Sequence, residues 1–258
     1  MKTIQYHDCN WYTLIPSVLY TVVMKPGPKP KRDKVYWSPE LAYAVGLITT
    51  DGCLYNDGRH ISLTSKDVDQ LQTFLRCIER EDVRITEKSG GYRKKITHAQ
   101  FSDVGLYIFL LAVGLTPNKT KTLGVLAIPD EYFWDFVRGL FDGDGCSYSF
   151  YDSIYKRSYR FYISFASASP AFVDWLREKV RAIAGIRGHI GRRPGKSYLD
   201  LKYSKREAVQ LARLMYHHND VPALSRKRLK ALAALTIAEE SMAQVACRRK
   251  RARIGLSW

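Results

Sequence analysis

Apolar and polar positions follow the same order twice along this chain. Each series opens with an apolar helix, continues through two short strands to a second helix, and then adds two more strands and a helix. The alternating strands at 61–65 and 163–167 occupy matching places in the two series. Turn residues such as Asn56, Asp57 and Gly58 separate neighbouring strands and favour hairpins. The pattern therefore predicts two halves, each with the order helix–two strands–helix–two strands–helix.

An aspartate ends the first helix of each series. The two helix ends share the frame Gly-Leu-x-x-x-Asp-Gly-Cys-x-Tyr, which places Asp51 in the first half and Asp144 in the second. Matching features follow both motifs in the same order, and the second half carries extra residues around 151–160, where loops tolerate insertion. We interpret the chain as an internal duplication with a period long enough for a small domain.

The residue types at the motif indicate a metal site between two packed helices. Gly46 and Gly139 each cost about 1 kcal/mol in a helix relative to alanine, and close approach of two helix backbones offsets that cost. Such packing alone explains the glycines. It does not explain two aspartates at helix C-termini, where two carboxylates repel one another unless a cation lies between them. Asp51 and Asp144 are therefore predicted to bind divalent metal ions side by side.

Charge and cysteine content narrow the class of partner. The chain has 41 Lys and Arg residues against 25 Asp and Glu, a formal net charge of +16, which favours a polyanion such as nucleic acid. Its five cysteines show no CxxC spacing, so they indicate neither a zinc site nor a disulfide framework. Cys53 and Cys146 are expected to be small packing residues in a reducing compartment. No stretch reaches the length of a membrane span.

We expect five segments along the chain. An N-terminal extension with a basic, proline-rich arm covers 1–37, the first half 38–122, a linker 123–129, the second half 130–240 and a basic tail 241–258. The alternating prolines of the arm disfavour helix and sheet, and the arm suits either a DNA-tracking element or a solvated linker. Ser38 is expected to cap the first motif helix, and Asp130 and Glu131 to open the second.

The two motifs resemble those of the LAGLIDADG homing endonucleases in their single-chain form. The resemblance is strongest at 44–52 and 136–145 and extends to 115–123, 128–130 and the Arg226-Lys227 pair, so it covers most of the chain. It implies a pseudo-symmetric α+β fold of two αββαββα halves. The two motif helices would pack at the centre, and two antiparallel sheets would straddle DNA.

The resemblance also implies roles for four residues. Asp51 and Asp144 match the positions that bind divalent ions, normally Mg²⁺ (or Mn²⁺), shared across the two scissile phosphates. Lys119 and Lys227 match basic residues near the active centre, which stabilise charge at the phosphate or polarise a water. Ordinary surface lysines are the alternative interpretation of this pair.

Two further pairs of positions are compared with the family pattern. Ser65 and Ser167 fall where a polar residue often orders solvent, although serine is short for that role. The earlier acidic position of the motif is Thr49 in the first half and Asp142 in the second, a departure that makes asymmetry between the two cleavage half-sites an open alternative.

DNA recognition is expected from the strands, because a sheet laid along the major groove can contact successive base edges. Alternation allows only about half of the polar strand residues to face DNA, and the sequence leaves open which half. Because the two halves differ in these residues, the preferred DNA site should be asymmetric. The candidates are Tyr55, Arg59, Ser62, Thr64, Arg93, Lys95, Tyr148, Arg157, Arg160, Arg192, Arg193, Lys196, Tyr198 and Lys202.

The leading function is a site-specific, metal-dependent endonuclease that makes a double-strand break in DNA by phosphodiester hydrolysis, with an intron- or intein-encoded origin. Two alternatives on the same scaffold stay open, an intron RNA maturase and a non-catalytic DNA-binding regulator. The two aspartates argue against the regulator, because a binder gains nothing from carboxylates that face phosphate. We expect a monomer in an intracellular reducing compartment, either the bacterial cytoplasm or an organelle, with double-stranded DNA as partner and no membrane.

Overall fold

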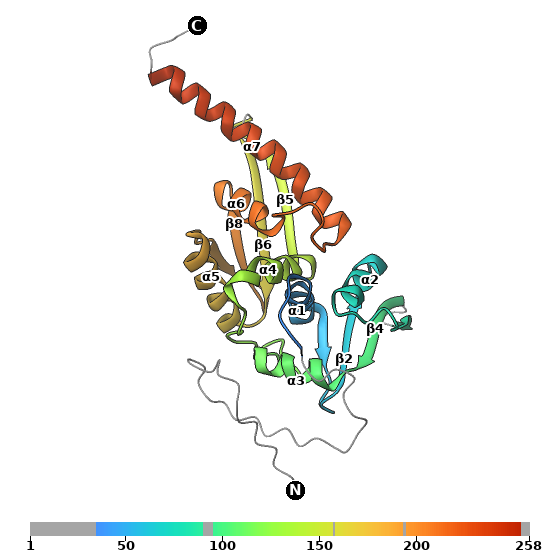
Figure 1. Cartoon of the computed structure of the whole chain (residues 1–258). Helices are drawn as coiled ribbons and strands as arrows, with labels where there is room; N and C mark the ends of the chain where they lie inside the picture. The colour runs from blue at the N-terminus through green and yellow to red at the C-terminus, as the bar shows by residue number, and fades with distance from the viewer. Residues whose placement is uncertain (1–34, 90–94, 157, 193–194, 254–258) are drawn as a thin grey trace.

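The computed structural model describes residues 35–89, 95–156, 158–192 and 195–253. In that part of the chain the fold is α+β, with two four-stranded antiparallel sheets, so the expected fold class is confirmed (Figure 1). The proline-rich arm and the candidates Arg93, Arg157 and Arg193 lie outside the described residues. Among the described residues no helix is long and apolar enough to cross a membrane.

The first half has the expected αββαββα order, and its strands form a sheet in the order β1-β2-β4-β3. Its motif helix begins as predicted, since the Ser38 hydroxyl accepts a hydrogen bond from Leu41 N–H. The elements are α1 (Pro39–Asp51), β1 (Gly52–Leu54), β2 (His60–Ser65), α2 (Val68–Cys77), β3 (Ile85–Ser89), β4 (Lys95–Ser102) and α3 (Val104–Val113).

The second half repeats this order, and its sheet follows β5-β6-β8-β7. One difference concerns Asp130 and Glu131, which were expected to open the motif helix. They form a short 3-10 turn, η2 (Asp130–Tyr132), and the α-helix begins after it at Phe133. The remaining elements are α4 (Phe133–Asp142), β5 (Gly145–Tyr151), β6 (Tyr159–Ser167), α5 (Pro170–Ala184), β7 (His189–Arg192), β8 (Leu199–Ser204), α6 (Arg206–Met215) and α7 (Ser225–Arg253).

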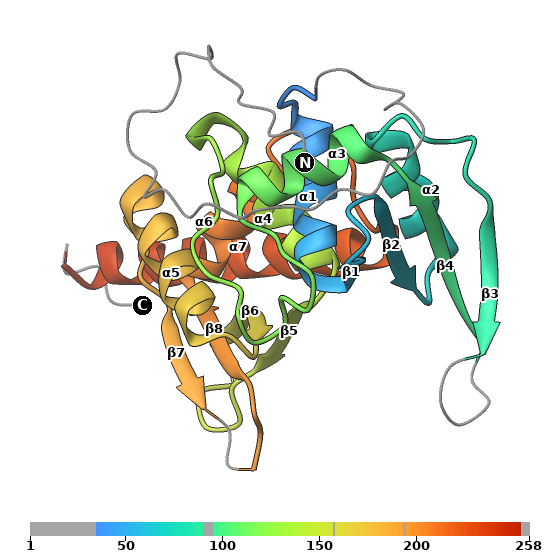
Figure 2. The ribbon, with the colours of Figure 1, turned by 90° about the horizontal axis from the view of Figure 1, so that it is seen from below.

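Helices α1 and α4 pack against each other between the two sheets, which extend to either side of them (Figure 2). The helices cross at Gly46 and Gly139. A methyl group on Gly46 would lie 2.8 Å from Gly139 Cα, and one on Gly139 would lie 2.9 Å from Gly46 Cα. Each would also overlap a backbone carbonyl oxygen of the other helix, that of Phe136 or Tyr43. Backbone-to-backbone contact at these two positions brings the two motif ends together.

Gly139→Ala should lower the free energy of unfolding by about 1–3 kcal/mol, because the added methyl meets backbone that cannot rotate away. Gly124→Ala is the matched control, since a methyl there has no atom within 4 Å. Chemical denaturation of both variants gives the comparison. Equal stability of the two variants would contradict this packing.

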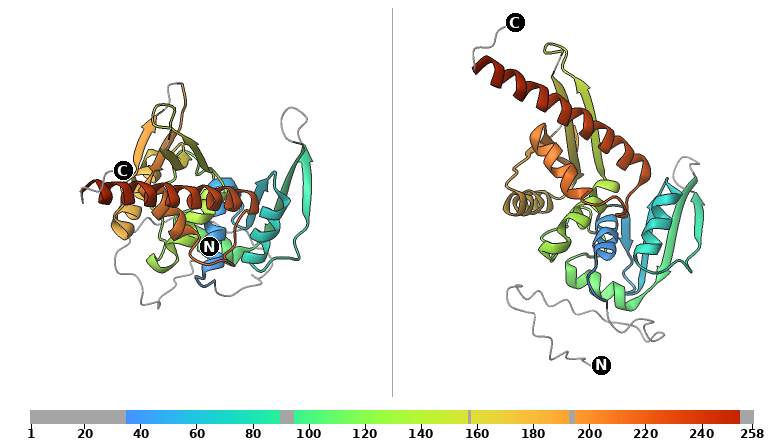
Figure 3. Two further views of the ribbon diagram at one scale, coloured as in Figure 1. Left: turned by 90° about the horizontal axis from the view of Figure 1, so that it is seen from above. Right: turned by 45° about the horizontal axis from the view of Figure 1, so that its top comes forward.

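Helix α7 is the longest helix of the described chain and contacts both β5 and β6 (Figure 3). Its buried alanines, Ala231, Ala234 and Ala238, allow this close approach. The helix continues past residue 240, where the second half was expected to end. The division of the chain into five segments stays a prediction.

The expectation for two of the cysteines is wrong. Cys53 and Cys146 are exposed rather than packed. Each follows a buried glycine, Gly52 or Gly145, that begins a strand against the core. Alternation along the strand therefore turns the cysteine to the opposite face of the sheet.

Candidate active site

The two motif helices end next to each other. Helix α1 ends at Asp51, and α4 ends at Asp142, from which Gly143 leads to Asp144. Gly143 lies directly against the end of α1, because a methyl group on it would overlap Thr50 Oγ1 and would lie 3.1 Å from Asp51 Oδ2. The glycine thus allows the Asp51 carboxylate to approach the backbone that carries Asp144.

Partial burial disfavours the charged form of both carboxylates, and repulsion from Asp144 adds to this effect at Asp51. Burial, and after it the charge of Asp144, raises the pKa of Asp51 from 3.8 to about 6. Burial also raises the pKa of Asp144, and the ammonium groups of Lys227 and Lys119 oppose both shifts. A site that disfavours its own negative charge gains free energy when a cation binds to it.

Lys227 caps the end of the second motif helix. Its ammonium donates to the carbonyl oxygens of Phe141 at 2.8 Å, Gly143 at 2.6 Å and Gly145 at 2.8 Å. An ammonium group has three donors, so this arrangement uses all of them. The helix-end carbonyls lack helical partners, and a cation is favourable at this negative end of the helix dipole. Lys227 therefore stabilises the turn that presents Asp144.

Lys119 occupies the corresponding place in the first half. It is buried, and its ammonium donates to the carbonyl oxygen of Gly52, the residue after Asp51. Burial lowers the pKa of Lys119, while the nearby Cys53, Asp51 and Asp144 oppose that shift. Within the described part of the chain this is its one hydrogen bond, so two donors remain for water or phosphate. The two lysines are thus equivalent in position but differ in their hydrogen bonding.

Lys227→Met should lower the free energy of unfolding by about 1.5–3 kcal/mol, because it leaves three backbone carbonyls without their charged donor. Methionine keeps most of the length of the side chain. Lys230→Met, at an exposed position one turn further along α7, should change stability by less than about 0.5 kcal/mol. Thermal or urea unfolding distinguishes the two variants. Unchanged stability of Lys227→Met would show that the cap contributes nothing.

Asp142 serves to join the two halves. Its Oδ2 accepts from Tyr43 Oη of α1 at 2.8 Å and from Leu224 N–H, just before α7, at 2.7 Å. Burial raises its pKa to about 6, with these two donors opposing the shift. At the matching position Thr49 donates to Val45 O within its own helix, at 2.7 Å. The departure from the repeat therefore coincides with a contact that only the second half makes.

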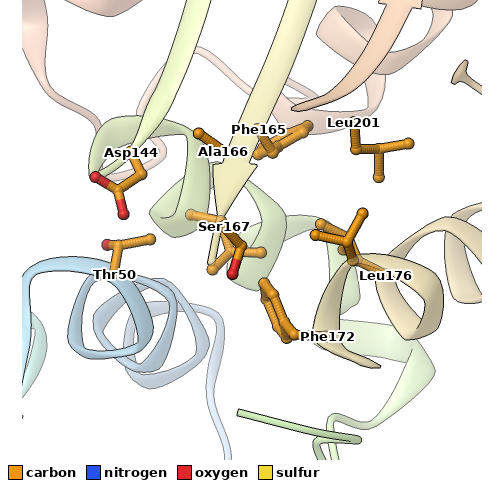
Figure 4. Close-up of a pocket in the computed structure, with 10 residues that line it drawn as sticks. Thr50, Asp144, Phe165, Ala166, Ser167, Phe172, Leu176 and Leu201 are labelled. Carbon is orange, nitrogen blue, oxygen red and sulfur yellow. The ribbon is translucent and has the colours of Figure 1, made fainter. Parts of the chain in front are cut away.

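Each of the two serines expected to order solvent accepts from the N–H group two residues further along, at 3.0 Å for Ser65 and 3.2 Å for Ser167, and their other contacts differ. Ser65 donates to Gln70 Oε1 at 2.6 Å and accepts from Asp67 N–H at 3.0 Å, so it fixes the start of α2. Ser167 lines a small pocket beside Asp144 and Thr50 (Figure 4). The rest of that pocket is apolar, formed by side chains such as those of Phe165, Phe172 and Leu176.

The donor set at the helix ends fits a hard divalent cation. Among the described residues no cluster of three or more His, Cys, Asp or Glu side chains could hold a metal by itself. Asp51, at the end of α1, and Asp144, in the turn after α4, would provide carboxylate oxygens. The nearby carbonyl oxygens of Gly52, Gly143 and Gly145 accept from lysines, and each has a second lone pair. Such all-oxygen sites suit Mg²⁺ or Mn²⁺ and leave further positions for water and phosphate oxygens.

The strand pairing fixes which residues share the open face of the first sheet, the face turned away from the core. Ser62 pairs with Gln100, and Thr64 pairs with His98. Ile61 and Leu63 are buried on the other face. Tyr55 lies over the open face, since its hydroxyl donates to Gln100 Oε1 at 3.2 Å. Arg59 lies in the β1–β2 turn near Asp57, and Lys95 begins β4.

The second sheet has an open face with more aromatic and basic side chains. Tyr148, Arg160 and Lys202 lie on it, by pairing and alternation. Arg192 pairs with Leu199, which lies on the core-facing side of β8. Lys196 and Tyr198 lie in the turn between β7 and β8. The structure therefore brings about half of the described candidates to the two open faces.

Solved structures with the same architecture confirm the fold. The homing endonuclease I-WcaI bound to its DNA recognition sequence matches with a TM-score of 0.55 at 14% identity, over 76% of this chain and 88% of that one. The LAGLIDADG meganuclease I-AabMI bound to uncleaved DNA matches with a TM-score of 0.54 at 14% identity, over 83% and 97%. This chain has the LAGLIDADG fold.

The LAGLIDADG fold does not by itself identify an activity. Full-length DUF199/WhiA from Thermatoga maritima also matches, with a TM-score of 0.50 at 12% identity, over 85% of this chain and 70% of that one. No protein-family model and no curated protein matches the sequence. At such identities the likeness shows the fold alone, so the activity must be argued from the residues at the motif ends.

Some residues of this LAGLIDADG fold escaped sequence analysis. His98 and Gln100 lie on the open face, yet within β4 only Lys95, its first residue, was considered as a DNA contact. Their alternation with Ala99 and Phe101, which are buried, is a usable signal. Arg138 and Tyr43, which hold the helix pair to the second half, carry no such local signal because their partners are distant in sequence.

Proposed function

We propose that this chain is a site-specific endonuclease that hydrolyses both strands of duplex DNA with the help of Mg²⁺ or Mn²⁺. The observation that carries the proposal is the placement of Asp51 and Asp144 at adjacent ends of two helices that cross at glycines. Repelling carboxylates are costly in a purely structural helix pair, and a divalent cation removes that cost. The positive net charge of +16 supports a polyanionic substrate.

The reaction follows from this arrangement. A water oxygen attacks phosphorus in line with the 3′ oxygen, the P–O3′ bond breaks, and the water proton passes to solvent while the 3′ oxygen takes up a proton. When bound, the divalent ion supplies Lewis-acid stabilisation of the attacking and leaving oxygens. Asp51 and Asp144 are the residues that would hold the ion. Lys119, with donors to spare beside Asp51, is the better placed lysine to stabilise charge on phosphate.

Lys227 has a different role in this proposal. Its three hydrogen bonds to backbone carbonyls make it a positioning residue for Asp144. The two open faces, at either side of the motif helices, are proposed to contact the DNA major groove. Because Gln100 on one face corresponds to Lys202 on the other, the preferred site should be asymmetric.

The alternatives differ from this proposal in their ligand. An intron RNA maturase would select RNA, and a DNA-binding regulator would select duplex DNA without cutting it. The motif ends favour the nuclease, since carboxylates facing phosphate weaken simple binding. We also propose that the chain acts as a monomer, because one chain contains both motifs. Its proposed role is DNA cleavage in intron homing, in an intracellular reducing compartment.

Binding selection tests the substrate class. The protein is mixed with randomised duplex DNA and randomised RNA libraries in Ca²⁺, and the retained molecules are sequenced. We expect one asymmetric duplex DNA site. Selection of RNA over DNA would replace the proposal by the maturase, and retention without any sequence preference would remove the claim of site specificity.

A further inference from the structure

The hairpin between β5 and β6 exposes large apolar side chains at its end. Phe150 is 49% exposed, Ile154 81% and Tyr155 68%. We refer to these three residues as the tip cluster. Isolated exposed apolar residues are common, but a group at the end of a projecting hairpin marks an interaction surface. Figure 3 shows this hairpin extending alongside α7.

The tip cluster is held in an ordered turn. Asp152 Oδ1 accepts from the N–H groups of Ile154 and Tyr155, both at 3.0 Å, and Asp152 Oδ2 accepts from Arg160 Nε at 2.9 Å and Nη2 at 2.6 Å. Helix α7 packs against both strands. The apolar groups are therefore presented with little conformational freedom to lose on binding.

A ladder of rings connects the tip cluster with the open face of the second sheet. Phe150 stacks on Tyr162 with ring centroids 5.9 Å apart, and Tyr162 stacks on Tyr148 at 4.8 Å. Lys202 Nζ lies 5.8 Å from the ring of Tyr148 and 5.9 Å from that of Tyr162. Aromatic faces with neighbouring cations suit nucleic-acid bases and phosphates.

The equivalent hairpin of the first half, β1–β2, is described in full and carries no such tip. Its β1–β2 hairpin pairs over three residues, whereas β5 and β6 pair over seven. The β1–β2 turn is polar, with Asp57 accepting from the N–H groups of Arg59 at 3.2 Å and His60 at 3.0 Å. Of these two matching hairpins, the apolar tip therefore lies on β5–β6 and not on β1–β2.

We propose that the tip cluster stacks on bases of the duplex at one base step of the second half-site and partly unstacks that step. This inference rests on the proposed function. Apolar wedges inserted at base steps kink DNA, and pyrimidine–purine steps unstack most easily. A strand rises about 3.3 Å per residue and DNA about 3.4 Å per base pair, so the step should lie about six to eight base pairs from the cleavage centre.

Fluorescence of 2-aminopurine tests this contact. The base is placed in turn at each position of the selected duplex site, and wild-type protein is added in Ca²⁺. We expect a severalfold rise at one step of the second half-site and none at the matching place of the first. Ile154→Ser with Tyr155→Ser should abolish the rise and weaken binding about tenfold or more.

Tyr151→Ser is the matched control. Tyr151 is 59% exposed on the same hairpin, but it pairs with Tyr159, and alternation places it on the face opposite Phe150. It should leave the fluorescence rise and the affinity within about twofold of wild type. An equal loss in the control would show that hairpin integrity matters rather than stacking, and would overturn the inference.

Other outcomes separate this inference from the proposed function. If wild-type protein selects and cuts duplex DNA while the double serine variant binds and fluoresces like wild type, only the tip contact is wrong. If wild-type protein selects no duplex DNA, the nuclease proposal and the tip contact both fail. If sedimentation shows a dimer that the double serine variant converts to a monomer, the cluster is an interface between copies instead.

Discussion

Asp51→Asn or Asp144→Asn should lower the rate of DNA cleavage by at least about 10³-fold, equivalent to about 4 kcal/mol of transition-state stabilisation. Either change replaces a carboxylate that would hold the divalent ion by a neutral amide of nearly the same shape. Binding of the selected DNA site should persist, since both side chains lie at the motif ends rather than on the open sheet faces. Loss of a negative charge near phosphate should even strengthen binding without divalent ions.

The Asp51→Asn variant should also be more stable than wild type at neutral pH. A carboxyl whose folded pKa of about 6 exceeds its ordinary 3.8 disfavours folding once it ionises, a penalty that grows as the pH rises from about 4 to 6 and persists above. At pH 7.5, Asp51→Asn should therefore raise the free energy of unfolding by about 1–2 kcal/mol, less than the full shift because the group is partly solvated.

Three measurements separate function from folding in this series. Cleavage, DNA affinity and denaturant unfolding are compared with Asp174→Asn, a control at a side chain that is 63% exposed on α5. The control should behave as wild type in all three. Cleavage by Asp51→Asn within about tenfold of wild type would contradict the metal-site assignment. Unfolding of the variant would instead support a purely structural motif.

Arg138→Met should lower the free energy of unfolding by about 3–5 kcal/mol. Arg138 is fully buried, and its guanidinium donates to Pro222 O at 2.7 Å, Met215 O at 2.8 Å and Asp135 Oδ1 at 2.6 Å. Methionine fills similar volume but leaves two carbonyls and a carboxylate without this donor. These contacts hold α4 to the segment between α6 and α7, from which Leu224 reaches Asp142.

Two variants check the physical cause of that loss. Arg177→Met removes an arginine that is 36% exposed and pairs with Glu178 at 3.2 Å, and it should cost less than about 1 kcal/mol. Arg138→Met combined with Asp135→Leu should recover part of the stability, because no buried carboxylate is then left without its cation. A loss below about 1 kcal/mol for Arg138→Met alone would show that the network is dispensable.

Local patterns were enough to predict the order of the elements. The repeated Gly-Leu-x-x-x-Asp-Gly frame predicts two helices that cross at Gly46 and Gly139, and alternation predicts the strands on either side. Such signals depend on neighbours within a few residues, so a single sequence contains them. The placement of Asp51 beside the turn to Asp144 follows once the two helices pack.

Long-range contacts account for most of what sequence analysis missed. Arginine is usually found at the surface. Arg138 is buried because its acceptors, the carbonyl oxygens of Met215 and Pro222, come from a segment far along the chain. The alternation of β4 shows that His98 and Ala99 face opposite sides, and pairing with β2 then places His98 beside Thr64 on the open face. The acceptors of the Lys227 ammonium are known only when the helix-end carbonyls are placed around it.

Cleavage of a randomised duplex library, read by sequencing the DNA ends, tests the central claim most directly. The wild-type protein is incubated with Mg²⁺ in one reaction and with Ca²⁺ in the other. We predict double-strand breaks at one asymmetric sequence in Mg²⁺, with bound but intact DNA in Ca²⁺. Specific retention of that sequence without breaks in Mg²⁺ would contradict the nuclease and favour a DNA-binding regulator on the same fold.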